Sequence, residues 1–254
     1  MTVASNPQGA WRGQTLQAVI GLALLVVTGI GLAHPVALRR GWLRVTDYRA
    51  VAPDVVVPRD LSSSAAVHLQ GLLDAARQRA EAWWGRLEAR PTVWYADTTE
   101  RKRALGFPNP YVSVPPEDRG GVLFVGPKGG EVDLLAHGLG HAEMLARFGA
   151  LWRRLPAWFD EGVAAQVDHR PFLVAAPPPS RPPRVEDLRA LATRAAFRGP
   201  EGEAALTEAR AAVSAWLAAA GGPAAVERLR RAMEDGASFE AAWNGLASAA
   251  DARR

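Results

Sequence analysis

The chain has 254 residues, of which 48% are apolar and 22% are charged. This composition allows one domain of about 200 residues with an N-terminal extension, or two small domains, and excludes a wholly disordered protein. The net charge of +4 comes almost entirely from arginines interspersed with acids and alanines, so we expect no nucleic-acid partner. The absence of cysteine excludes disulfides, thiolate zinc sites, iron–sulfur clusters and a cysteine nucleophile.

An uncharged, apolar segment runs from Leu16 to Ala33. As a helix it would be about 27 Å long, close to the thickness of a bilayer's hydrocarbon core. We therefore predict an N-terminal tail over residues 1–13 and an uncleaved transmembrane helix or signal anchor over residues 14–33. The alternatives are a cleaved signal peptide ending near Gly31–Ala33 and a buried helix of a soluble domain, although the segment has no polar face.

Arginines flank this apolar segment, with Arg12 before it and Arg39, Arg40 and Arg44 after it. The positive-inside rule would place the main domain in the cytoplasm. Short N-terminal anchors of bacterial exported enzymes commonly give the opposite orientation. The sequence thus predicts a single-pass membrane protein, and the arginines leave its orientation open.

A linker with one short strand is predicted over residues 34–60, followed by one domain over residues 61–250. Its first helix is capped by a serine among residues 62–64 and extends to about Glu88, because apolar residues recur there every 3.6 positions. A strand is predicted next, over Thr92–Ala96, and then a short helix over Thr98–Leu105. A loop rich in Pro and Gly follows over Gly106–Gly121, and a second strand over Val122–Val125.

The second half of the domain is predicted to be mostly helical. Helices over Val132–Phe148 and Pro156–Val167 precede an irregular, proline-rich segment over Pro171–Pro183. The remainder is rich in alanine and is divided into three or four helical pieces at Gly199-Pro200, Gly221-Gly222-Pro223 and Gly236. A small N-terminal sheet followed by helices is typical of an α+β fold.

The helix over Val132–Phe148 contains two histidines four residues apart, His137 and His141. Both imidazoles project from one helix face and can reach a single ion. An antiparallel second helix would bring the carboxylate of Glu161 to the same ion. Two His and one Glu leave the fourth position of a tetrahedral Zn²⁺ open, as in catalytic zinc sites. The alternative is a pair of histidines that only make hydrogen bonds within the domain.

The segments His137–His141 (HGLGH) and Trp158–Ala164 (WFDEGVA) resemble motifs of the gluzincin zinc metallopeptidases. In that family H-E-x-x-H on one helix is followed by a Glu on the next. More narrowly, the chain resembles the bacterial peptidase-MA-like domains, many of which follow a membrane segment. The resemblance covers roughly residues 120–245.

This resemblance implies a zincin-like fold with an active-site helix, in which His137, His141 and Glu161 bind zinc. It implies a peptide or protein as substrate or partner, paired along strand Val122–Val125 at the edge of the sheet. It also implies that the main domain lies outside the cytoplasm, attached to the membrane through residues 14–33.

The chain departs from the family at Gly138, where the family has the general-base Glu. General acid–base catalysis is typically worth about 10²–10⁴ in rate, so its loss predicts a weak or inactive hydrolase that still binds metal. No acid replaces this Glu, because Glu143 lies on another face of the helix and Asp160 should point elsewhere. Asp133 is expected to bond to an imidazole instead.

A second departure concerns the tetrahedral intermediate, which related peptidases often stabilise with a Tyr or His from a later helix. All three tyrosines precede the motif, and His169 is expected to be an exposed loop residue. Two tryptophans flank the second motif, Trp152 and Trp158, and they either belong to the core or form a wall of the cleft.

We therefore predict a membrane-tethered, zinc-binding, metallopeptidase-like protein with little or no peptidase activity. One alternative is an active zinc metallopeptidase that uses another base. The other is a metal-free helical scaffold or interaction module. If the cleft is otherwise intact, the substitution Gly138→Glu should raise peptidase activity by orders of magnitude.

Overall fold

The computed structural model describes residue 43, residues 45–175 and residues 179–251. The predicted tail and the predicted transmembrane helix over residues 14–33 lie outside this part. Within it, no helix has the length and apolarity needed to cross a membrane. The chain divides into two units, residues 1–49 and 50–254, and the second contains the elements that form the site.

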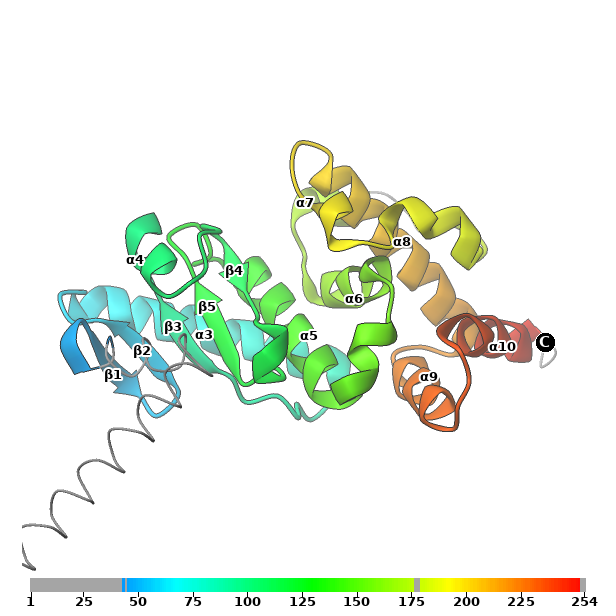
Figure 1. The fold of residues 1–254 in the computed structure, drawn as a ribbon, viewed down its shortest axis with the longest axis horizontal. Helices are drawn as coiled ribbons and strands as arrows, with labels where there is room; N and C mark the ends of the chain where they lie inside the picture. The colour runs from blue at the N-terminus through cyan, green and yellow to red at the C-terminus, as the bar shows by residue number, and fades with distance from the viewer. Residues whose placement is uncertain (1–42, 44, 176–178, 252–254) are drawn as a thin grey trace, which may run out of the picture. The chain divides into compact units, whose positions relative to one another are not determined.

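A five-stranded sheet has the order β1-β2-β3-β5-β4 (Figure 1). Strands β2, β3 and β5 pair in parallel, whereas β4 runs antiparallel to β5. The strands are β1 (Tyr48–Ala52), β2 (Val55–Pro58), β3 (Thr92–Tyr95), β4 (Val112–Ser113) and β5 (Val122–Val125). Two of them, β1 and β2, lie in the segment where a linker with one strand was predicted.

The prediction that Val122–Val125 forms the edge of the sheet is wrong. This strand, β5, lies between β3 and β4, and β4 is the edge strand on that side. Strand β4 falls within the segment Gly106–Gly121, which was predicted to be a loop. A two-residue strand between prolines and glycines is too short to show the alternation of apolar and polar residues that identifies a strand.

The first long helix is α3 (Ser63–Trp84), and the hydroxyl of Ser62 caps its N-terminus by accepting a hydrogen bond from the backbone N–H of Ala65. The helix ends earlier than predicted because Gly85 adopts a φ of 73°. The short helix α4 (Thr99–Ala104) is capped by Thr98 in the same way.

Helix α5 (Val132–Phe148) has the predicted limits, and α6 (Ala157–Ala164) follows it after the 3₁₀ helix η2 (Gly149–Arg154). The other helical elements after β1 are η1 (Pro116–Asp118), η3 (Ala165–Val167), α7 (Pro171–Val174), η4 (Val185–Leu191), η5 (Arg194–Phe197), α8 (Gly202–Ala220), α9 (Ala224–Glu234) and α10 (Phe239–Asp251). The α+β class with a small sheet and a mostly helical second half is thus confirmed.

Two large apolar clusters make up most of the core in the described part of the chain. One joins the sheet to α3 and α5 through side chains such as Val93, Leu123 and Leu73. The other joins the end of α5 to α6 and α8–α10, with Trp158, Trp216 and Trp243 near its centre. Helix α5 contributes to both clusters, so its histidines lie where the sheet-side core and the helical core meet.

Candidate metal centre

Helices α5 and α6 bring His137, His141 and Glu161 together into a group that could hold a metal ion. The two Nε2 atoms are 3.0 Å apart, and each lies 3.3 Å from Oε2 of Glu161. A tetrahedral Zn²⁺ with bonds of about 2.0–2.1 Å holds its ligands about 3.4 Å apart. The triangle therefore has the size that such an ion requires, and the predicted ligand positions are brought together.

Small residues allow α6 to approach α5 this closely. A Cβ atom at Gly140 would lie 2.8 Å from Cα of Ala164, which is closer than real Cβ contacts. On the other side of α6, a Cβ atom at Gly162 would lie 2.4 Å from the carbonyl oxygen of Ala209 in α8. Any larger side chain at either position would move Glu161 away from the histidines.

A buried carboxylate lies against the second ring nitrogen of each histidine. Nδ1 of His137 is 3.2 Å from Oδ2 of Asp168, and Nδ1 of His141 is 2.9 Å from Oδ2 of Asp160. These are ion-pair contacts, and neither has the alignment of a hydrogen bond. A nearby carboxylate favours the proton on Nδ1, which leaves the lone pair of Nε2 directed at the centre of the triangle.

Three electron-pair donors thus converge on one point: the two Nε2 atoms and Oε2 of Glu161. With both protons on Nδ1, these atoms offer three lone pairs to one ion. With a proton on an Nε2 atom, the same short distances are hydrogen bonds among the three side chains. The surrounding charges also favour a positive charge at the centre. The carboxylates of Asp160, Glu161 and Asp168 outnumber the guanidinium groups that contact them, those of Arg170 and Arg194. The centre is therefore suited to a positive charge, either a metal ion or a proton held between the three side chains.

Two arginines hold the carboxylates in place. Arg170 contacts both oxygens of Asp168, with its Nη2 2.6 Å from Oδ2. Arg194 donates to Oε1 of Glu161 at 2.7 Å and also to Asp160. Each acidic side chain around the histidines is therefore fixed by an arginine on its far side.

The site also shifts the pKa values of its groups. Burial alone would lower the pKa of His141, but Asp160 and Glu161 raise it to about 9. Burial opposes ionisation of Glu161, yet the two imidazoles bring its pKa well below the ordinary value. Asp168 behaves similarly, because His137 and Arg170 outweigh burial and lower its pKa to about 2. Each carboxylate is therefore ionised at neutral pH, as metal binding requires.

Two predictions about acidic residues near the site are wrong. Asp160 does not point elsewhere but contacts His141, because a short turn of α6 places both of its acids on the side facing α5. Asp133 contacts no imidazole; it pairs with Arg79 and accepts a hydrogen bond from the backbone N–H of His169. The carboxylate beside His137 belongs to Asp168 instead, which lies after η3.

Other expectations near the site are confirmed. Glu143 lies away from the centre, and its carboxylate accepts hydrogen bonds from the backbone N–H groups of Glu88 and Ala89. His169 is exposed. Of the two tryptophans, Trp158 is a core residue, whereas Trp152 donates to Asp160 at 3.1 Å and so supports the site.

Sequence reasoning missed the roles of Asp168 and Arg194. The tripeptide Asp168-His169-Arg170 offered a weak signal, since an acid and an arginine two residues apart can pair. Arg194 offered none, because it lies in a different element far along the chain and only the fold brings it to Glu161.

Position 138 is enclosed by the sheet. A Cβ atom at Gly138 would lie 2.5 Å from Cγ1 of Val112 in β4 and 2.9 Å from Cδ1 of Leu123 in β5. A side chain at this position would therefore require Val112 and Leu123 to move. Restoring the carboxylate of the family motif thus also requires the packing of the sheet against α5 to change.

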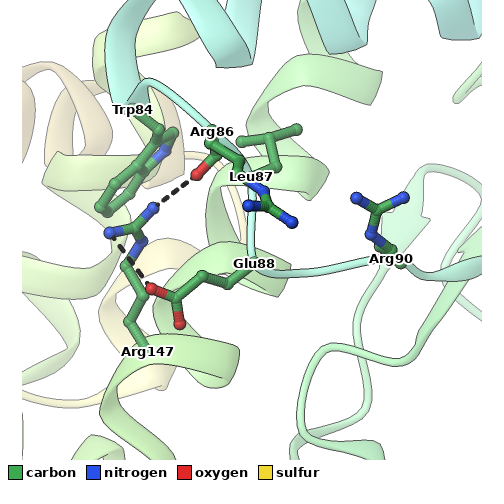
Figure 2. A pocket seen from close by; sticks show the side chains of 6 residues that line it. All are labelled: Trp84, Arg86, Leu87, Glu88, Arg90 and Arg147. Carbon is green, nitrogen blue, oxygen red and sulfur yellow. Dashed lines mark hydrogen bonds and ion pairs between the residues drawn. The ribbon is translucent and has the colours of Figure 1, made fainter.

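A separate pocket of about 580 Å³ lies near the C-terminal end of α5 (Figure 2). Arg147 crosses it, with its guanidinium 5.1 Å from the centre of the Trp84 ring and 3.0 Å from the carbonyl oxygen of Arg86. The other lining residues are Leu87, Glu88 and Arg90. None of the proposed metal ligands lines this pocket.

Comparisons with protein-family models, curated proteins and solved structures found no match to this chain. The motifs suggest a peptidase family, whereas the structure supports only a possible metal-binding group. In the described part of the chain, His137, His141 and Glu161 are within metal-binding distance of one another.

Proposed function

We propose that this chain is a zinc-binding, metallopeptidase-like protein that has little or no peptidase activity and binds a peptide or protein partner at a membrane. The observation that carries the proposal is the convergence of two imidazole Nε2 atoms and one carboxylate oxygen, which lie 3.0–3.3 Å from one another. This donor set and its size suit Zn²⁺.

A bound zinc ion would act as a Lewis acid toward a carbonyl oxygen. His137, His141 and Glu161 would hold it. Asp168 and Asp160 would keep each imidazole in the tautomer that binds metal, and would raise the basicity of the ring. This arrangement of ligands and supporting carboxylates goes beyond what a structural histidine pair needs.

Weak or absent hydrolysis follows from the neighbourhood of position 138. Among the described residues, the acids that contact the centre are Glu161, Asp160 and Asp168, and each is already engaged by an imidazole and an arginine. Val112 fills the space beside Gly138. No carboxylate that could take a proton from water therefore faces the open side of the metal position.

Strand β4 supports a role in peptide binding. It is the edge strand on the β5 side of the sheet, and its Val112 packs beside α5 at Gly138, close in sequence to both histidines. An extended peptide can add to such an edge through backbone hydrogen bonds. In the proposed function, a partner peptide pairs with β4 and passes the metal.

The resemblance to gluzincins and peptidase-MA-like domains supports the same proposal. So does the apolar segment Leu16–Ala33, which would anchor the domain to a membrane, with the domain on the outer side. These parts of the proposal rest on the sequence alone.

Metal content of the full chain tests the proposal. We expect one zinc per chain in the wild-type protein and none in the His137→Ala variant. His169→Ala is the matched control, since this exposed histidine lies outside the cluster and should leave the zinc content unchanged. Peptide hydrolysis by the loaded wild-type protein should be at background.

One observation favours a metal-free scaffold instead. The pKa of His141 is raised to about 9, so a proton could serve as the cation at the centre. Absence of zinc from both the wild-type protein and His137→Ala, after incubation with excess zinc, would favour this scaffold. Efficient peptide hydrolysis would favour an active peptidase with another base.

A further inference from the structure

The two oxygens of Glu161 have different surroundings. Oε2 lies 3.3 Å from Nε2 of His137 and 3.3 Å from Nε2 of His141, so it faces the metal position. Oε1 accepts a hydrogen bond from Nη1 of Arg194 at 2.7 Å. One oxygen is therefore directed toward the metal position while the other is held by a guanidinium group.

Arg194 is itself fixed from several sides. Its second terminal nitrogen donates to Asp160, the acid that contacts His141. Its guanidinium carbon lies 5.0 Å from the centre of the Trp152 ring, and Trp152 donates to the other oxygen of Asp160. The guanidinium group thus bridges the carboxylates of two neighbouring residues, with one terminal nitrogen on each.

We infer that Arg194 is a positioning residue that restricts Glu161 to metal binding through one oxygen and so keeps one coordination position open for a ligand. The inference rests on the proposed metal site. It adds that Arg194 limits the number of ligand atoms that the protein gives to the metal. A free glutamate can bind a metal through both oxygens, and the second oxygen would then occupy a further position. Arg194 prevents this by competing for Oε1.

The same contacts connect Arg194 to both halves of the site. Through Glu161 it acts on the ligand from α6, and through Asp160 it acts on the orientation of His141. Loss of Arg194 should therefore lower metal affinity about 10–100-fold, as is typical when a group that supports a metal ligand is removed. It should also allow Glu161 to bind the metal through both of its oxygens.

Cobalt(II) loading of the full chain provides a spectroscopic test, because visible absorption by cobalt weakens as its coordination number rises. We expect the wild-type protein to bind one cobalt ion with strong absorption, and added azide to shift the spectrum by binding at the open position. In Arg194→Ala we expect weaker absorption, a loss of the azide response and the lower metal affinity.

Three further variants complete the experiment. Arg194→Gln is a second neutral variant for the case that Arg194→Ala does not fold, and it should behave in the same way. Arg194→Lys keeps a cation near Oε1 and should retain the wild-type spectrum and azide response. Arg198→Ala removes an exposed arginine directly after η5 and should change nothing.

An unchanged spectrum and azide response in a folded, loaded neutral variant would overturn the inference about Arg194. Loss of both properties in Arg194→Lys would overturn it as well. A wild-type protein that binds no cobalt is a different result, because it would contradict the proposed metal site itself.

Discussion

Two glutamates, the buried Glu143 on α5 and the partly buried Glu161 on α6, show how a structural carboxylate differs from a proposed metal ligand. Both oxygens of Glu143 accept hydrogen bonds, from the backbone N–H groups of Glu88 and Ala89 and from Nε of Arg147 at 2.6 Å. Oε1 of Glu161 likewise has a donor, but its Oε2 faces the Nε2 atoms of two imidazoles.

This difference matters because a buried polar group normally has its hydrogen-bonding partners. The Glu143 network is complete, and its Arg147 lies across the pocket of Figure 2, where it also reaches the carbonyl oxygen of Arg86. The network connects the end of α5 to the segment after α3 and needs nothing from outside. The Glu161 cluster instead brings three electron-pair donors together, and in the proposed function a cation would complete it.

The largest expected effect is a loss of stability when the hydrogen-bond network of Glu143 is broken. Glu143→Ala would remove the closest carboxylate of the largely buried Arg147 and the acceptor for two backbone N–H groups. We expect a loss of about 3–5 kcal/mol in the free energy of unfolding, measured by urea denaturation.

The control for this variant is Glu88→Gln, because the Glu88 side chain is 57% exposed and lies 3.6 Å from Arg147. Its unfolding free energy should change by less than about 1 kcal/mol. Equal effects of the two substitutions would contradict the view that Glu143 is structural.

The metal cluster should respond in metal affinity more than in stability. Asp168→Asn removes the negative charge beside Nδ1 of His137, so the ring loses its preference for the metal-binding tautomer. We expect zinc affinity to fall about 10–100-fold in a competition assay with a chelating dye. Asp133→Asn, whose carboxylate pairs with Arg79 and touches no imidazole, should leave the affinity unchanged.

Gly138→Glu distinguishes two explanations for weak hydrolysis. Either only the general-base carboxylate is missing, or apolar side chains also fill the space beside position 138. The sequence alone predicted a gain in peptidase activity, but the structure places Val112 and Leu123 within 3 Å of the added Cβ atom. We now expect no gain in activity and a loss of about 1–3 kcal/mol in stability from overpacking. The double variant with Val112→Ala should recover part of this stability, and a large gain in hydrolysis by the single variant would contradict this account.

A further effect is expected at another buried charge, Lys102, whose ammonium group donates to the carbonyl oxygens of Tyr111 and Phe124. Burial lowers the pKa of Lys102 from 10.5 to about 7. Between these values the unfolded chain binds more protons than the folded one, so stability should rise as the pH increases from 7 to 9.

Urea midpoints at pH 7 and pH 9 test this prediction. The rise should be smaller in Lys102→Met and unchanged in Lys128→Met, which removes the exposed lysine, the only other one in the chain. The same rise in all three proteins would contradict a lowered pKa for Lys102.

The parts of the site that could be predicted from sequence are those encoded within one helix or its immediate neighbour. His137 and His141 follow from helical spacing, and Glu161 follows from a helix that returns along the first. The ends of α5 could be predicted because its apolar period is regular. The parts that could not be predicted depend on contacts between distant segments.

Arg194 and β4 illustrate the second group. Arg194 reaches Glu161 only because η5 packs near α6, and a single arginine in an arginine-rich chain carries no signal of this. Strand β4 is defined by its pairing with β5 rather than by its own pattern. That pairing, in turn, places Val112 against Gly138, which changes the interpretation of the glycine from a lost carboxylate to a packed position.

X-ray absorption at the zinc edge of the full-length, zinc-loaded chain tests the central claim most directly. The account predicts two imidazole nitrogens and one carboxylate oxygen of Glu161 at about 2.0–2.1 Å, and the loss of one imidazole in His141→Ala. A first shell of oxygen alone, or one that is identical in wild type and His141→Ala, would contradict a metal site formed by α5 and α6.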